Sequence, residues 1–305
     1  MEDFCLFLTL TFCNFREVEM DAKRRVQRIA SHILPTASSI LSNTTTTTTL
    51  TSTSFTAIIA TADDYEATNQ NPLIFPLLKP YLDNNNSSNS NGNTTSLTPL
   101  EQCEILWRLS RAHERMWHAS VATGNTTARD EHLRLGLSTS QTAVQINIAS
   151  GAANKWRAIF LGMEAEAGGV ITSARNANLI HTHLQAALIE LPNDASMHFM
   201  MGRTIFTMAG ATWSERTAAK VIGYTIPAAT FSDSISHFRK AQKLAPTSIM
   251  NVLWLSKSYL RSEKNKTKSL ILGKKWLLRA SKMKVLKDED IMAQKEAKEL
   301  VRGLR

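Results

Sequence analysis

The histidines are the side chains most suited to metal binding or acid–base catalysis, and their spacing disfavours both roles. His181 and His183 are two residues apart, which places them on different sides of a helix, and His113 and His118 share no helical face either. The stretch 136–138 lacks the closing glycine of a nucleophile elbow, and no glycine-rich phosphate loop occurs. We therefore expect a binding protein in place of an enzyme, with no catalytic residues, no metal site and no cofactor.

A second set of side chains is suited to holding an anionic partner. The candidates for a partner-binding groove are Arg108, Arg111, Trp156, Arg157 and Arg203. Guanidinium groups that project from neighbouring helices can clamp a carboxylate or a phosphate. The alternative is that these arginines pair with Glu104, Glu114 or Glu164 on neighbouring turns. Trp107, Trp156, Trp213, Trp254 and Trp276 could line such a groove, but at helical spacing we interpret them as core residues.

These groups would be positioned by helices in a repeated pattern. The residues that follow Pro192 and Pro246 match at the same steps: His198, Met201, Gly202 and Ile205 after the first, and Val252, Leu255, Ser256 and Tyr259 after the second. That spacing is typical of the tetratricopeptide repeat, a helix–turn–helix unit of about 34 residues. Two earlier first helices fit the same positions, with Leu106, Leu109, Ser110 and His113 in one and Trp156, Ile159, Phe160 and Met163 in the other.

Caps, glycines and prolines predict where the helices begin and end. Thr98 is expected to cap the first, with Pro99 in its first turn. The expected helices cover about 101–121, 133–148, 152–167, 176–190, 194–209, 234–244, 248–260, 270–284 and 288–301, with a shorter one at 214–222 inside an insertion. The fold class predicted is all-α, a tetratricopeptide-like helical-hairpin solenoid with an inserted helix between the helices of the third pair and a C-terminal capping helix.

The first third of the chain is expected to contribute little to this fold. Residues 1–98 include a threonine run and an Asn/Ser-rich stretch at 84–93, so we interpret them as a largely disordered, low-complexity region ahead of a repeat domain at 99–305. A basic amphipathic helix at 22–34 resembles a mitochondrial targeting segment, or it belongs to a tail without partners. The apolar run at 4–15 is too short for a transmembrane helix, which needs about 20 residues. Three unpaired cysteines favour a reducing compartment.

The positive charge is concentrated at the C-terminus. Residues 239–305 hold 18 Lys/Arg against 6 Asp/Glu, whereas the whole chain has a net charge of +9. The candidates for a basic surface are Lys264, Lys266, Lys268, Lys274, Lys275, Lys282 and Lys284. Such a field attracts acidic protein surfaces or anionic phospholipid, although a solvated helix face is the commonest fate of a lysine run. No nucleic-acid partner is expected, because no RNA- or DNA-binding module is recognisable.

Several motifs of the repeat region carry a resemblance to a known family. They are residues 106–112 (Leu-Trp-Arg-Leu-Ser-Arg-Ala), 155–159 (Lys-Trp-Arg-Ala-Ile), 191–194 (Leu-Pro-Asn-Asp), His198 with Gly202-Arg203, and in the insertion Trp213, Glu215-Arg216 and Gly223 ahead of Pro227, followed by Tyr259-Leu260 and Trp276-Leu277. Together they make residues 100–300 similar to the regulator of microtubule dynamics family of tetratricopeptide proteins. The sequence departs from the family pattern at 131–149 and at 204–206.

The resemblance implies a function as well as a fold. It implies a non-enzymatic adaptor associated with microtubules. Together with the charge distribution, this predicts binding of microtubules, tubulin or another acidic protein partner through a repeat groove and the basic C-terminal surface. The alternative it implies is a phospholipid-binding or lipid-transfer module at an organelle membrane contact, as in one branch of the family. The expected location is cytoplasmic and associated with microtubules or the spindle, with mitochondrial targeting as a further possibility from residues 22–34.

Overall fold

The computed structural model describes residues 52–84, 97–286 and 288–303. All regular structure in these residues is helical, which confirms the all-α prediction. The described residues divide into two compact units, one that ends at residue 160 and one that begins at residue 161. The expected targeting helix at 22–34 lies outside the described residues. Within the described residues, no helix is both long enough and apolar enough to span a bilayer.

The first unit contains α3 (Ser52–Ala67), η2 (Asn71–Leu73), α4 (Ile74–Asn84), α5 (Pro99–Thr123), α6 (Thr126–Ile146) and the start of α7 (Gly151–Glu190). Helix α5 begins as predicted, because Thr98 accepts a hydrogen bond from the Glu101 amide at 3.2 Å and Glu101 accepts one in return. Helices α5 and α6 form the first pair. Helix α6 starts seven residues before its predicted beginning, because Asn125 caps it by accepting from the Ala128 amide.

The segment 52–84 differs from the expectation of disorder for residues 1–98. Helices α3 and α4 pack on α5, and Ala62, Ile74 and Leu78 are fully buried against Ile105 and Leu109. Their partly buried neighbours Phe55, Ile58, Ile59, Tyr65, Phe75 and Tyr81 complete this core. The compositional argument failed here because residues 55–82 hold enough clustered apolar side chains for a core, although threonine-rich and asparagine-rich stretches surround them.

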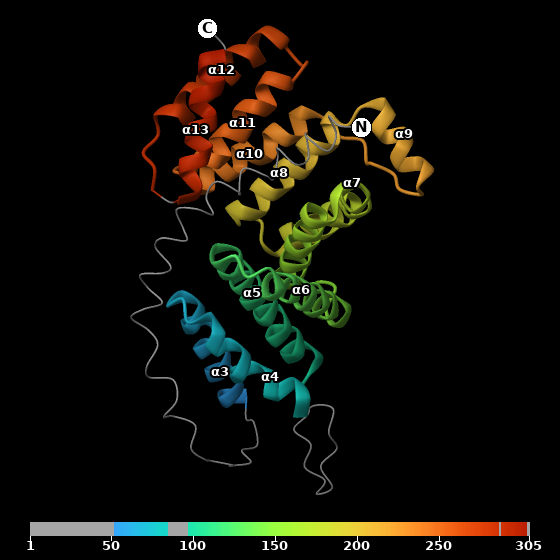
Figure 1. Ribbon diagram of the computed structural model, residues 1–305, viewed down its shortest axis with the longest axis vertical. Coiled ribbons are helices and arrows are strands. Elements are labelled where there is room, and N and C mark those ends of the chain that lie inside the picture. The colour runs from blue at the N-terminus through green and yellow to red at the C-terminus, as the bar shows by residue number, and fades with distance from the viewer. Residues whose placement is uncertain (1–51, 85–96, 287, 304–305) are drawn as a thin grey trace, which may run out of the picture. The chain divides into compact units, whose positions relative to one another are not determined.

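The second unit holds the rest of α7, then α8 (Ala195–Gly210), α9 (Trp213–Val221), α10 (Phe231–Leu244), α11 (Ile249–Arg261), α12 (Lys266–Lys282) and α13 (Asp288–Gly303), coloured from yellow-green in α7 to red in α13 in Figure 1. Gly169 has φ 72°, which favours glycine, and it bends α7 into two helices. The second half folds back, so that the Asn176 amide donates to the Leu161 carbonyl at 3.0 Å. The two halves of α7 form the second pair, although the sequence predicted a break of several residues there.

The third and fourth pairs are α8 with α10 and α11 with α12, as the repeat register predicted. Gly202 allows α8 and α10 to approach closely, because a Cβ at that position would lie 2.8 Å from the Phe238 ring. Ser234 donates to the Gly202 carbonyl at 2.9 Å and also hydrogen-bonds Ser258 of α11, which links the two pairs inside the core. Helix α9 is the inserted helix, and α13 packs on α11 and α12 as the terminal cap. The predicted fold class is confirmed.

Candidate functional site

Two arginines of α5, Arg108 and Arg111, are neutralised from within the chain. Arg108 donates from Nε and Nη2 to the two Asp63 carboxylate oxygens at 2.9 and 2.8 Å, and from Nη1 to Glu104 at 2.6 Å. Arg111 donates to the same Asp63 at 2.7 Å. Although partial burial by itself raises the pKa of Asp63, the hydrogen bonds and charges of Arg108 and Arg111 outweigh it and hold that pKa below its usual range.

Of the two alternatives for these arginines, an anion-binding groove or ion pairs within the chain, the structure contains the ion pairs. The pairing of Arg108 with Glu104 is one of those considered from the sequence. Asp63 was missed because it lies on α3, in a region where no structure was expected. Trp107 lies against both guanidinium groups, and its ring centre is 4.0 Å from the Cζ atom of Arg108.

The candidates on the first half of α7 also serve the fold. Trp156 is buried, as the core interpretation of the tryptophans predicted. Arg157 donates to the Leu137 carbonyl at 3.0 Å and lies 3.4 Å from the Gln141 side-chain oxygen, so it braces α7 against α6. Both residues belong to the first unit, whereas Arg203 belongs to the second. Four of the five groove candidates thus belong to the first unit and one to the second.

Arg203 takes part in a cluster of charges around one indole ring. Its guanidinium lies 4.9 Å from the centre of the Trp254 ring, and the Lys257 ammonium lies 4.4 Å from the same ring centre. Lys257 forms an ion pair with Glu296 of α13 at 2.5 Å. Burial lowers the pKa of Arg203 to about 10, and the negative charge of Glu166 partly offsets that effect.

Lys257 was missed by the sequence reasoning, although Trp254-x-x-Lys257 on one helix face was a usable signal. Burial lowers the pKa of the Lys257 ammonium, while the charge and hydrogen bond of Glu296 act in the opposite direction. Only about a fifth of the Lys257 side chain is exposed. The cluster fixes α8, α11 and α13 to one another, and its cations already face carboxylates of the chain.

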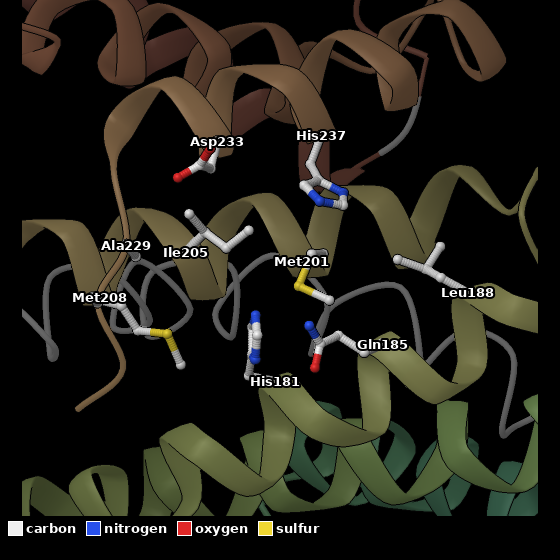
Figure 2. A pocket seen from close by; sticks show the side chains of 10 residues that line it. His181, Gln185, Leu188, Met201, Ile205, Met208, Ala229, Asp233 and His237 are labelled. Carbon is white, nitrogen blue, oxygen red and sulfur yellow. The ribbon is translucent and has the colours of Figure 1, made fainter. Parts of the chain in front are cut away.

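A cavity of about 450 Å³ lies between α7, α8, α10 and the segment that precedes α10 (Figure 2). His181 and Gln185 face Met201, Met208 and the α10 residues Asp233 and His237, with Ile205, Leu188, Ala228 and Ala229 completing the wall. Its volume is in the range of small-ligand pockets, of about 300–1,000 Å³. Imidazole, carboxylate and thioether groups therefore meet in a space that could hold a small or elongated ligand.

Burial lowers the pKa of the three histidines at or beside this cavity, His181, His198 and His237. His198 lies behind His237, with its Nδ1 3.1 Å from Nδ1 of His237 and its Nε2 3.0 Å from the Pro192 carbonyl. A carbonyl only accepts, so His198 carries its proton on Nε2 and accepts at Nδ1 from His237. Burial, followed by the charges of His198 and Lys240, lowers the pKa of His237 to about 4. Among the described residues, no group of three or more His, Cys, Asp or Glu side chains could hold a metal ion.

The insertion between α8 and α10 is held by a single guanidinium. Arg216 on α9 donates to the carbonyls of Met208 and Ala211, where the insertion begins, and to those of Ile226 and Pro227, where it ends. Thr212 and Glu215 cap α9 reciprocally. Trp213 was expected in the core, but 80% of it is exposed, because α9 directs it away from the packed helices. Bracing of the insertion is thus the role of Arg216.

The seven candidate lysines of the basic surface are all exposed. Five of them lie on α12, with Lys264 just before it and Lys284 just after it. Within the described residues none of the seven forms an ion pair, in contrast to Arg108, Arg111 and Lys257. These seven lysines, which we call the basic surface below, therefore leave positive charge available for a partner.

The geometry defines a class of protein: a helical-hairpin repeat scaffold of the tetratricopeptide kind, with internally paired arginines and an open basic surface. Within that class, the family model described as Regulator of microtubule dynamics protein 1-3 matches residues 58–305. The chain belongs to this family, as the sequence motifs indicated. The match begins inside α3, which agrees with the packing of α3 and α4 on the first pair.

Three named relatives agree with this membership. Regulator of microtubule dynamics protein 1 of Bos taurus is 32% identical over 67% of this chain and 62% of its own length. The protein of the same name in Mus musculus is 31% identical over 67% of this chain and 65% of its own length. Human regulator of microtubule dynamics protein 2 is 26% identical over 67% of this chain and 48% of its own length. The matched part thus spans less than two thirds of these relatives.

One solved structure is a distant neighbour. A human IFIT1 dimer with PPP-AAAA superimposes with a TM-score of 0.30 at 14% identity, over 77% of this chain and 63% of that chain.

Proposed function

We propose that the chain is a non-enzymatic adaptor that binds microtubules, or another acidic protein surface, through the basic surface on α12. The observation that supports this most directly is the contrast between two kinds of cation. Arginines on the first helices have carboxylate or carbonyl partners inside the chain, whereas the seven lysines face solvent. Exposed positive charge attracts acidic surfaces over a range set by the ionic strength.

The names of the relatives supply the choice of partner. They are called regulators of microtubule dynamics, and tubulin carries acidic tails that suit a lysine-rich helix. A cytoplasmic location with microtubules follows from the same proposal. The repeat-groove candidates Arg108, Arg111, Trp156, Arg157 and Arg203 become secondary in it, because their present contacts would have to be given up before they could bind an acidic segment.

The test is co-sedimentation of the full chain with stabilised microtubules over a series of salt concentrations. A triple charge reversal at Lys268, Lys275 and Lys282 should weaken binding at least tenfold, because three attractive contacts become repulsive. The matched control reverses Lys220, Lys240 and Lys243, which are also exposed but lie on α9 and α10. Equal losses in both variants, or a wild-type chain that stays in the supernatant at low salt, would reject the proposal.

The cavity in Figure 2 favours a second candidate, the binding of phospholipid or another lipid. Leu188, Met201, Ile205 and Met208 provide an apolar wall that could accommodate an acyl chain. Native mass spectrometry of the purified chain would show co-purified lipid in this case. A Met201→Gln substitution should then reduce the lipid signal, and an unliganded mass for the wild-type chain argues against this candidate.

A further inference from the structure

Helix α12 exposes aliphatic residues in line with its lysines. Lys268, Ile271, Lys275, Leu278 and Lys282 follow one another at steps of three and four residues, which places all five on one face of the helix. Ile271 is 62% exposed and Leu278 is 44% exposed. We call these five residues the α12 stripe. It extends over about 21 Å, at 1.5 Å per residue.

The stripe is distinct from the face by which α12 is held in the fold. Gly273, Leu277 and Ala280 lie on the opposite face of α12 and are buried, with Leu277 and Ala280 in the core shared with α11 and α13. The side chains of Ile271 and Leu278 are therefore not needed to fill that core. A purely electrostatic surface has no use for them, and exposed aliphatic residues that repeat within one charged stripe suggest a contact area.

From this exposed line of lysines and aliphatic residues, we infer that the α12 stripe docks an acidic amphipathic helix of a partner protein. Ile271 and Leu278 are seven residues apart, the spacing at which one helix meets another along a shared seam. A partner helix with apolar residues at the same spacing and glutamates or aspartates beside them would cover both aliphatic side chains. Its carboxylates would meet Lys268, Lys275 and Lys282, so the charges are complementary along the whole stripe.

A lipid surface fits the stripe less well. A helix that lies in a bilayer interface buries a continuous apolar face and keeps its lysines along the polar side. On α12 the lysines alternate with the aliphatic residues in the same line, and Lys274 and Arg279 are exposed beside them. Pushing Ile271 and Leu278 into acyl chains would carry Lys275 in with them. A partner helix can accommodate that alternation by placing a carboxylate opposite each lysine.

This inference rests on the proposed function, because it names the chemistry of the partner at the same basic surface. The first experiment measures binding of the full chain to two designed helical peptides rich in glutamate. One has leucine at every seventh position, and the other has serine there at the same net charge. The wild-type chain should bind the leucine peptide about tenfold more tightly, from partial burial of two aliphatic side chains.

An Ile271→Ser/Leu278→Ser double variant should lose this discrimination and keep its affinity for the serine peptide. The matched control is Ile189→Ser/Leu244→Ser, which removes two exposed aliphatic residues from α7 and α10. The control should retain the discrimination. Circular dichroism melts of both variants exclude unfolding as the cause. Equal binding of the two peptides by the wild-type chain would overturn the inference.

A second experiment separates this inference from the proposed function. Stabilised microtubules and vesicles of phosphatidylserine with phosphatidylcholine are offered to the wild-type chain and to the Ile271→Ser/Leu278→Ser variant. If microtubule binding requires the lysines but the double variant binds as well as wild type, the adaptor role stands and the docking inference is wrong. If the variant loses vesicle binding alone, the stripe is a membrane contact and the inference is likewise wrong. Peptide discrimination without microtubule binding would retain the inference and reject the microtubule partner.

Discussion

The carboxylate of Asp63 offers a direct test of whether α3 belongs to the folded domain. The proposed change is Asp63→Ala, which removes the acceptor of three hydrogen bonds from Arg108 and Arg111, at 2.7 to 2.9 Å. Arg108 is only 7% exposed, and its guanidinium would lose two of the four hydrogen bonds that it donates inside the protein. Breaking a buried ion pair by removing one partner costs about 3–5 kcal/mol.

Two features of the site reduce that magnitude. The Asp63 side chain is 41% exposed, so water can replace part of the lost contact, and Glu104 still accepts from Arg108. We therefore expect a loss of about 2 kcal/mol in the free energy of unfolding, below the range for a fully buried pair. For a domain of this size that corresponds to a fall in Tm of roughly 4–8 °C.

The assay is thermal and urea unfolding of the full chain followed by circular dichroism. The matched control is Asp64→Ala, because Asp64 is the next residue of α3, carries the same charge and is exposed. Surface substitutions of that kind change stability by about 0.5 kcal/mol or less. If Asp63→Ala and Asp64→Ala unfold at the same urea concentration, the charge cluster is not holding α3 on α5 and the reasoning fails.

Three further predictions address other parts of the molecule. Gly202→Ala should destabilise the second unit by about 1–3 kcal/mol through its Cβ contact with the Phe238 ring, whereas Gly162→Ala, which meets nothing within 4 Å, should cost nothing in a urea titration. Arg216→Met should speed limited proteolysis within 211–230 with little change in Tm, because four carbonyl contacts of the insertion are lost; unchanged cleavage would contradict this. Burial, then the charge of His132, lowers the pKa of His113 to about 4, so the unfolded chain binds this proton more readily. The contribution of neutral His113 to the free energy of unfolding is complete above about pH 6.5 and falls by about 3 kcal/mol as the pH is lowered towards and below 4. In a His113→Gln variant, the urea concentration at the unfolding midpoint should therefore fall less over that pH range than in the wild-type chain.

The features that the sequence predicted best are those set by neighbouring residues. Thr98 with Pro99, and Asp194, cap helices through contacts within three residues, so their positions could be derived from the sequence. The repeat register around Pro192 and Pro246 likewise placed α8 and α11, and the family followed from motifs in the same helices. Helix α12 starts four residues before its predicted start, because Asn265 adopts a left-handed conformation that the sequence pattern did not reveal.

The features that were missed depend on contacts between distant residues. Nothing near Arg108 in the sequence points to Asp63, 45 residues earlier, and low-complexity neighbours hid the apolar residues of α3. The exposure of Trp213 depends on how α9 is held by Arg216, and the ion pair of Lys257 depends on where α13 packs. Residue type and spacing identified cations suited to anion binding, but only packing determines which of them are already paired.

The difference between the two kinds of cation has a physical origin that bears on function. Arginine presents a planar array of donors that can satisfy several acceptors at once, so it suits positions where a cation must bind several groups of the chain, as Arg108 and Arg216 show. Lysine is strongly hydrated and is easily kept at a surface, where it interacts with a partner over a longer range. A chain that uses its arginines to fasten helices and leaves lysines with aliphatic residues on α12 separates stability from recognition. Substitutions in the α12 stripe should therefore change binding without changing the fold, which makes this helix the place where function can be tested with the least structural disturbance.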